Sequence, residues 1–217
     1  MKRWIFFDLG GTLIDETRQE ESIVNTIVSE FAQLGIAYSK LDVSEAMKDA
    51  SISYESVVKG AVCKLSKTPK QYNDIIHKAV YINELELLYP RVVQVLEQLS
   101  KQYNLGVIAN QAIGAESRLK KHNIYEFFSV FALSAEVGFS KPDQRIFEYA
   151  LQQANCQPKD AVMVGDRLDN DIYPANIIGM TTVRVLQGVA KYQNPLNEMY
   201  SPNFAYSLIG DMEDFTY

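Results

Sequence analysis

The stretch Trp4–Asp15, which reads WIFFDLGGTLID, decides the fold of this chain. Its leading residues, Trp4–Phe7, are apolar and rich in aromatic rings, which predicts a fully buried β-strand. Asp8 follows at once, and Gly10 and Gly11 then end the strand in a tight turn. The stretch therefore places a carboxylate at the carboxyl end of a buried strand, where open α/β sheets bind their ligands. Taken alone, it is equally compatible with an Asp8 that only caps the following loop.

Composition excludes several classes of protein. The 217 residues, 47% hydrophobic and 22% charged, suffice for one large domain or one domain with an insertion. The net charge of −6 argues against a general binder of nucleic acids or membrane surfaces. Apolar runs are too short for a membrane span or a signal peptide, so we expect a cytoplasmic protein. Cys63 and Cys156 lie far apart without metal-ligand spacing, and we expect both to be free, buried thiols.

Residues 16–86 have a helical pattern and lack any β-like run. Apolar residues such as Ile23, Ile27 and Phe31 recur at helical spacing, and Gly35 ends this first helix. A second helix is expected to follow Ser44, and Pro69 is expected to open a third. The predicted ranges are Glu16–Leu34, Ser44 to Lys64, and Pro69–Tyr81. This region is predicted to form an all-helical domain inserted after the first strand.

From Pro90 onward, predicted helices and strands alternate, which indicates a parallel sheet with helices on both faces. A helix starting at Pro90 would bury Val92, Val93, Leu96 and Leu99. The predicted strands are Leu105–Ala109, Phe127–Leu133, Ala161–Val164, Thr181–Leu186 and Phe204–Ile209, and further helices are expected over Glu116–His122, Asp143–Ala154 and Asp171–Gly179. The fold class is therefore α/β, with a Rossmann-like parallel core of residues 1–15 and 87–217 and a helical domain of residues 16–86.

Polar residues follow three of the predicted strands. Asp8, Asn110 and Asp166 each stand where a strand ends, so the parallel arrangement brings them to one edge of the sheet. Asp171 lies across a turn from Asp166, and Lys141 precedes a helix entered from the same edge. Clustered carboxylate oxygens suit Mg²⁺, which often shares its coordination shell with a phosphate. A lysine beside them would balance their charge.

These residues fall into four motifs, which stand in the order Asp8-Leu-Gly-Gly-Thr12, Ile108-Ala-Asn110, Ser140-Lys141-Pro142 and Gly165-Asp166-Arg-Leu-Asp-Asn-Asp171. In this order, and over nearly the whole chain, they resemble the haloacid dehalogenase superfamily of hydrolases, in particular members with a helical cap. The resemblance implies a cap over residues 16–86 that closes on a small phosphorylated substrate and excludes water.

The resemblance also implies a role for each motif residue. Asp8 would be the nucleophile that forms an aspartyl-phosphate, and Lys141 would orient it and neutralise phosphate charge. The implied Mg²⁺ ligands are Asp8, the carbonyl oxygen of Gly10 and Asp166, with Asp171 either a further ligand or a residue that supports the ligands. The implied phosphate-binding residues are Asn110, Lys141 and Gly11.

Two positions depart from the phosphatase pattern. Gly10 stands where that pattern has a second Asp, the general acid and base, and Ala109 stands where it has Ser or Thr. Loss of a general acid typically costs on the order of 10² to 10⁴ in rate. We therefore predict a bias toward substrates with good leaving groups, such as acyl, anomeric or phenolic phosphates, which depend less on a proton as they depart. His77, the one histidine of the helical region, is predicted to be a solvated helix residue.

Three other functions stay open at this point. A metal-free haloacid dehalogenase would attack carbon through Asp8, but it has no need of the carboxylate pair Asp166 and Asp171. A non-catalytic phosphate- or metabolite-binding protein would account for Gly10 and Ala109. A phosphonate hydrolase would need a Schiff-base lysine, for which Lys48 and Lys59 are the candidates, without special context. The sequence leaves the substrate and the oligomeric state open.

Overall fold

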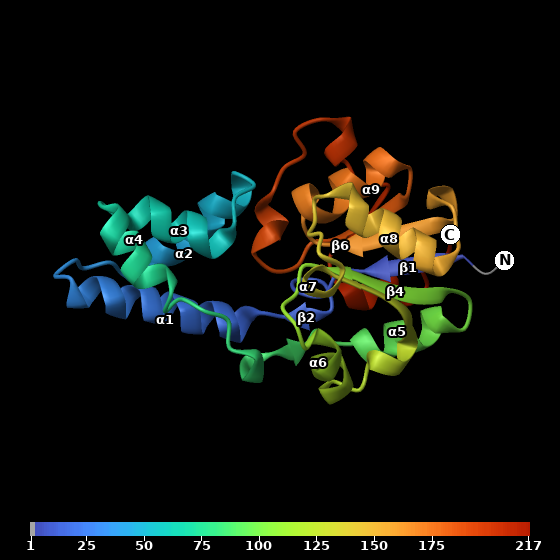
Figure 1. Ribbon diagram of the computed structural model, residues 1–217, viewed down its shortest axis with the longest axis horizontal. Coiled ribbons are helices and arrows are strands. Elements are labelled where there is room, and N and C mark those ends of the chain that lie inside the picture. Colours follow the sequence, from blue (N-terminus) through green and yellow to red (C-terminus); the bar gives the residue numbers. More distant parts are fainter. Residues whose placement is uncertain (1–2) are drawn as a thin grey trace. The chain divides into compact units, whose positions relative to one another are not determined.

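A computed structural model of the chain describes residues 3–217 (Figure 1). The chain folds into two compact units. One is an α/β unit made of the chain up to Asp15, Leu87–Lys191 and Pro195–Tyr217. The other is a helical unit of Glu16–Glu86, joined by the short segment Tyr192–Asn194 from the distant C-terminal part of the chain.

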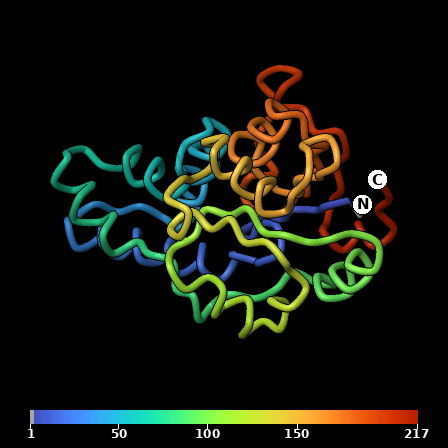
Figure 2. The backbone as a smooth tube through the Cα atoms, turned by 45° about the vertical axis from the view of Figure 1, so that its right-hand side comes forward, coloured from blue at the N-terminus to red at the C-terminus, as the bar shows by residue number. Residues whose placement is uncertain are grey.

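Six parallel strands form the sheet of the α/β unit, in the order β5-β4-β1-β6-β7-β8. In Figure 2 the blue β1 runs between the green β4 and the orange β6. This confirms the predicted α/β fold with a parallel sheet. The strands are β1 (Trp4–Phe7), β4 (Asn104–Ala109), β5 (Phe128–Leu133), β6 (Ala161–Gly165), β7 (Thr181–Val185) and β8 (Phe204–Tyr206).

Helices cover both faces of this sheet (Figure 1). Side chains alternate along a strand, so Ile5 and Phe7 of β1 point into one apolar core while Trp4 and Phe6 point into the other. The first core is covered by α5 (Val92–Ser100) and α6 (Ala115–Lys121), and the second by α8 (Gln144–Ala154) and α9 (Tyr173–Ile178). A short helix α7 (Ser134–Val137) follows β5, and short helical turns lie at Tyr125–Phe127, Pro158–Asp160, Glu198–Tyr200 and Ile209–Met212.

The face that α5 buries differs from the prediction at one position. Val95 is fully buried, whereas Val93 is 39% exposed. The helix begins after Arg91, and Val92, Val95, Leu96 and Leu99 share its inner face because they follow the i, i+3, i+4, i+7 spacing, which Val93 does not. The prediction that Val93 is buried in the core is therefore wrong.

Two very short strands that the sequence did not indicate lie where the chain passes between the units. β2 (Ile14–Asp15) pairs antiparallel with β3 (Leu87–Leu88). Two residues are too few to show any alternation of apolar and polar side chains. The main chain of Tyr89 extends this contact, since its N–H donates to the carbonyl of Leu13 over 3.0 Å.

The helical unit contains four α-helices among the described residues: α1 (Thr17–Gln33), α2 (Lys40–Ile52), α3 (Val57–Leu65) and α4 (Pro69–Ile76), with a short turn at Asn83–Leu85. The predicted second helix is wrong at its start and in its continuity. It starts after Ser39, which forms a reciprocal capping box with Asp42, and it breaks after Ile52, where Tyr54 has φ of 61°, before α3 continues to Leu65. The third predicted helix stops at Ile76, and His77 is exposed there as expected.

Both cysteines are free, but the prediction that both are buried is wrong, because Cys63 is exposed and Cys156 is half-buried. The helices described for residues 3–217 include none with the length and apolar character that a bilayer crossing requires.

Candidate active site

Asp8 lies directly beyond β1 at the carboxyl edge of the sheet. Its N–H donates to the carbonyl of Val164 on the neighbouring β6 over 2.9 Å, so the sheet ladder continues through Asp8 and fixes its main chain. The residue is 8% exposed. The strand therefore fixes the backbone from which the Asp8 carboxylate projects at this edge of the sheet.

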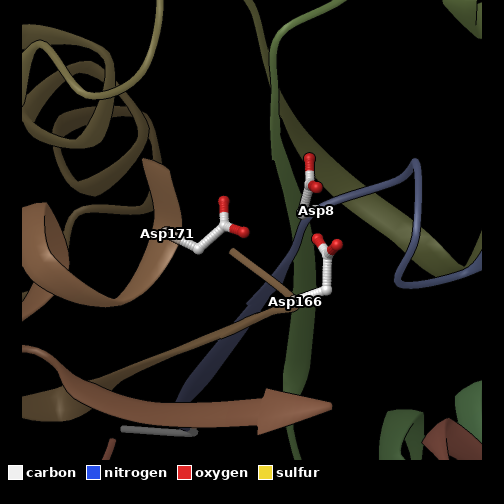
Figure 3. A group of neighbouring side chains, drawn as sticks. All are labelled: Asp8, Asp166 and Asp171. Atoms are coloured by element: carbon white, nitrogen blue, oxygen red, sulfur yellow. The ribbon is translucent and has the colours of Figure 1, made fainter. Parts of the chain in front are cut away.

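Two more carboxylates come from the chain after β6. Asp166 follows the strand immediately, and Asp171 lies in a single π-helical turn, Leu168–Ile172, that leads into α9. Oxygen atoms of Asp8, Asp166 and Asp171 all lie within 4.8 Å of one another. Figure 3 shows the three carboxylates pointing toward one another. The structure thus brings together the three acidic residues that the motif order predicted.

Lys141 bridges two of these carboxylates. Its ammonium donates to Asp8 Oδ1 over 2.7 Å and to Asp171 Oδ1 over 2.5 Å, and its side chain is 2% exposed. Asn110 holds the lysine in place through a pair of bonds: its Nδ2 donates to the carbonyl of Lys141 over 2.8 Å, and its Oδ1 accepts from the Lys141 N–H over 2.7 Å. The Asn110 amide, for which we predicted phosphate binding, is thus engaged with the lysine backbone.

Burial and crowded charge shift the ionisation of this group. Burial raises the pKa of Asp171 to about 6 against the attraction of Lys141, and the negative charge of Asp8 adds to the rise. For Lys141, burial works to lower the pKa, but the carboxylates of Asp171 and Asp8 outweigh it, so its pKa is raised. With all four groups charged, three carboxylates face one ammonium, and a divalent cation would relieve the excess negative charge.

The donor set fits Mg²⁺ chemically, because it consists of hard carboxylate oxygens gathered at the sheet edge. Asp8, Asp166 and Asp171 are the side chains that would hold the ion. The carbonyl oxygen of Gly10, the further predicted ligand, belongs to the turn that follows Asp8.

Two glycines leave the space that this cluster occupies. A methyl group on Gly11 would lie 2.5 Å from Asp166 Oδ2, and Gly11 also has φ of +68°. A methyl group on Gly165 would lie 2.4 Å from the carboxyl carbon of Asp171. Both distances are far shorter than any real contact, so each carboxylate sits where a Cβ would otherwise stand. Gly11 therefore has a steric role beside the phosphate-binding role that we predicted for it.

Some contacts of the site were not predicted from the sequence. Thr12 is fully buried, and its hydroxyl points to Asp166 Oδ1 at 3.5 Å. The N–H of Arg167 donates to Asp171 Oδ2 over 3.0 Å, while its guanidinium pairs with Asp169 at 2.6 Å. Arg167 and Thr12 lie inside two of the recognised motifs, so their positions in the sequence already indicated that they are near the site. Their contacts depend on the turn geometry after each strand.

A sequence profile described as haloacid dehalogenase-like hydrolase matches residues 5–185. This range includes all four motifs. The chain belongs to this family. The resemblance that the motifs suggested is therefore confirmed, and with it the assignment of the chain as a haloacid dehalogenase-like hydrolase.

Relatives in this family agree with the assignment. The chain is 30% identical over 214 residues to a glyceraldehyde 3-phosphate phosphatase of Methanocaldococcus jannaschii, a match that covers 93% of this chain and 91% of that one. It is 37% identical to the protein of the same name in Methanopyrus kandleri, over 54% of this chain and 51% of that one. In fold it is similar to the crystal structure of a haloacid dehalogenase-type phosphatase from Thermococcus onnurineus, with a TM-score of 0.65, 22% identity and coverage of 99% and 97%.

Proposed function

We propose that this haloacid dehalogenase-like hydrolase is a Mg²⁺-dependent phosphatase of small phosphorylated metabolites, acting through an aspartyl-phosphate on Asp8. The observation that carries the proposal is the bridged cluster. One buried lysine holds Asp8 and Asp171 at 2.7 and 2.5 Å, and Asp166 completes a set of three carboxylates. Family relatives named as phosphatases support the reaction class.

The chain's own residues account for the covalent steps. A carboxylate oxygen of Asp8 attacks phosphorus, and the bond from phosphorus to the leaving oxygen breaks. Lys141 orients Asp8, since it donates to Oδ1 of that residue, and its charge balances the approaching phosphate. Water then attacks the aspartyl-phosphate, which releases inorganic phosphate and restores Asp8. Bound at the three carboxylates, Mg²⁺ would supply positive charge to the transferring phosphoryl group.

The leaving group receives no proton from position 10, because Gly10 has no side chain to donate one. An alkoxide leaves poorly without a proton, whereas a phenolate or an acyl carboxylate leaves readily. We expect turnover to fall steeply as the pKa of the leaving group rises. Comparable efficiency on alkyl and phenolic phosphates would contradict this expectation.

The names of the relatives suggest which phosphorylated compounds to test as substrates. The Methanocaldococcus relative is named for glyceraldehyde 3-phosphate. A Bacillus cereus relative, 28% identical over 96% of this chain and 93% of its own, is named pyrophosphatase PpaX. These two compounds, with an aryl phosphate of good leaving ability, make a first substrate panel. Pyrophosphate has a phosphate leaving group, so it also tests the leaving-group expectation.

The deciding experiment is hydrolysis of para-nitrophenyl phosphate with and without Mg²⁺, in the wild-type protein and in Asp8→Asn. We expect Mg²⁺-dependent release of nitrophenolate that Asp8→Asn abolishes. Asp74→Asn is the matched control, because Asp74 lies in α4 and pairs with Lys70 on the surface. Mass spectrometry of the wild-type protein quenched in acid should show phosphate on the chain, and the same adduct should be missing in Asp8→Asn.

The second candidate is a phosphate- or metabolite-binding protein without catalysis, and Gly10 is the observation that favours it. In that case the wild-type protein would bind phosphate in calorimetry yet release no product from any substrate in the panel. Mg²⁺-dependent turnover that Asp8→Asn leaves intact would contradict both candidates.

A further inference from the structure

Arg184 is a buried cation that the proposed chemistry does not yet use. It lies on β7 in register with Gly165 of β6, one residue before Asp166, and it is 5% exposed. Val183 and Val185, its neighbours on β7, point into the core on the other face of the sheet. Removing a guanidinium from water is costly, so a buried arginine needs specific polar partners.

Two main-chain carbonyl oxygens are among the partners of Arg184. Its Nε donates to the carbonyl of Asp166 over 3.1 Å, and its Nη2 donates to the carbonyl of Ala190 over 2.7 Å. The first bond fixes the backbone from which the Asp166 carboxylate projects. The second fixes the short 3₁₀ turn Val189–Tyr192, which follows β7.

The same segment also holds the loop that carries the nucleophile. Gln187 is 4% exposed; its Nε2 donates to the carbonyl of Thr12 over 3.1 Å, and its Oε1 accepts from the N–H of Ile209 over 2.7 Å. Next to it, a methyl group on Gly188 would lie 3.6 Å from Gly11 Cα and 4.0 Å from Asp166 Oδ2. Asp166 is thus confined by Gly11 and Thr12 on its carboxylate and by Arg184 on its backbone.

We propose that Arg184 is a positioning residue for metal binding, which holds Asp166 at the place that Mg²⁺ requires. The inference rests on the proposed function insofar as it takes Asp166 to be a metal ligand. Mg²⁺ demands near-ideal octahedral geometry at about 2.0–2.1 Å, whereas Ca²⁺ accepts variable geometry at longer distances. A loosened Asp166 should therefore weaken Mg²⁺ binding more than Ca²⁺ binding.

The test compares Arg184→Lys with wild-type protein by isothermal titration of Mg²⁺ and of Ca²⁺, without any substrate. Lysine keeps the charge but lacks the fork that reaches both carbonyls. We expect Arg184→Lys to weaken Mg²⁺ affinity about tenfold, within the range usual for residues that support metal ligands. The ratio of Mg²⁺ to Ca²⁺ affinity should fall as well. Arg145→Lys is the matched control, since Arg145 pairs with Asp143 on the surface, and it should leave both affinities unchanged.

A measurement on the wild-type protein covers the case in which Arg184→Lys does not fold. In ¹⁵N-labelled protein, the Nε–H signal of Arg184 should exchange slowly with water, and it should shift during Mg²⁺ titration with the dissociation constant found by calorimetry. A fast-exchanging signal that does not respond to Mg²⁺ would overturn the inference. So would equal Mg²⁺ affinity in wild type and Arg184→Lys, or an equal loss for Mg²⁺ and Ca²⁺.

These outcomes separate the inference from the proposed function. Protein that binds Mg²⁺ but cleaves no phosphate ester contradicts the function and leaves the Arg184 comparison valid. Turnover with unchanged Mg²⁺ affinity in Arg184→Lys contradicts the inference alone. Wild-type protein that binds no Mg²⁺ overturns both.

Discussion

At the scale of single residues, Lys141 is the cation that pairs with two carboxylates of the buried ion cluster. Lys141 makes two short ionic hydrogen bonds at a position with almost no contact with water. Carboxylates in such a place are stable as anions only with a paired cation or a bound metal. The pKa of Asp171, which burial raises to about 6 even with Lys141 present, shows that the pairing is incomplete.

The first prediction concerns Lys141→Met, which leaves two buried carboxylates without their shared cation. We expect loss of activity and, at pH 7.5, a free energy of unfolding lower by about 3–5 kcal/mol. Because the pKa of Asp171, about 6 with Lys141 present, should then rise further, the folded variant would bind more protons than folded wild-type protein between about pH 6 and 8, so the deficit should shrink as the pH falls toward 6.

Urea unfolding of Lys141→Met between pH 4.5 and 8 measures this effect. Lys101→Met, at the exposed end of α5, is the control. The contribution of wild-type Lys141 itself changes at a higher pH. Its pKa is raised on folding, so its contribution is fully present at neutral pH and is lost at alkaline pH. A deficit that does not depend on pH would show that packing, not charge, explains the loss.

The second prediction separates two effects of a side chain at Gly11: strain of the left-handed backbone and steric overlap with the Asp166 carboxylate. Gly11 and Gly35 have similar backbone conformations, with φ of +68° and +74°, but a methyl group on Gly35 would meet nothing within 4 Å. Gly→Ala at either position should cost roughly 1–2 kcal/mol of stability from the left-handed backbone. Only Gly11→Ala should also displace the Asp166 carboxylate, and we expect it to lose Mg²⁺ binding. Thermal unfolding and calorimetry on both variants test this, and a Gly11→Ala variant with wild-type Mg²⁺ affinity would refute it.

At the scale of elements, the segment after β7 links parts of the structure that are distant in sequence. Its start is held by Gln187 and Arg184 in the α/β unit, and its end, Tyr192–Asn194, belongs to the helical unit. There Gln193 Nε2 donates to the carbonyl of Ser51 over 3.1 Å, and the hydroxyl of Tyr54 donates to the carbonyl of Asn194. Besides the crossings at residues 15–16 and 86–87, this segment takes the chain into the helical unit and back.

The third prediction tests whether this segment supports the end of α2. Gln193 is 2% exposed, so Gln193→Ala removes a buried hydrogen bond worth about 0.5–1.5 kcal/mol. We expect faster amide exchange at the C-terminal turn of α2 and a correspondingly lower stability of the helical unit. Gln157→Ala, at an exposed loop position, should change neither. Unchanged exchange in α2 would mean that residues 192–194 are dispensable for that helix.

At the scale of the whole molecule, each unit contains one free cysteine, so thiol chemistry can report on each unit separately. Cys63 is exposed in α3 of the helical unit, and Cys156 is half-buried after α8 in the α/β unit. Burial, with some contribution from Asp160, raises the pKa of the Cys156 thiol to about 11. At pH 8 this thiol is therefore almost wholly protonated, while the thiolate is the reactive form.

The fourth prediction is two-phase labelling by a disulfide reagent such as Ellman's reagent at pH 8. We expect Cys63 to react quickly in the folded protein and Cys156 to react slowly, at a rate that rises with pH toward 11 and with any opening of the α/β unit. Cys63→Ser should remove the fast phase and keep the slow one. If Cys156→Ser removed the fast phase instead, Cys156 would be the more accessible thiol, which would contradict the prediction.

The sequence by itself determined the α/β class, the parallel sheet and the convergence of Asp8 with Asp166. These features follow from local sequence, because a run of consecutive apolar residues predicts a buried strand and the carboxyl ends of parallel strands meet at one edge of the sheet. The same logic placed Lys141 in the turn that precedes α8. It could not show that Asn110 clasps the lysine backbone, since that pair depends on how two loops meet.

Tertiary structure alone decided the contacts that join distant residues. Gln193 meets Ser51 across 142 positions, and Gln187 meets Thr12 across 175, distances at which periodicity carries no information. The exposure of Cys63 and the inward turn of Val95 instead of Val93 were also settled there, because burial depends on the exact phase of a helix against its neighbours. A buried arginine such as Arg184 is the clearest case. In sequence it is one more charged residue, and only the packed sheet gives it two carbonyl oxygens to hold.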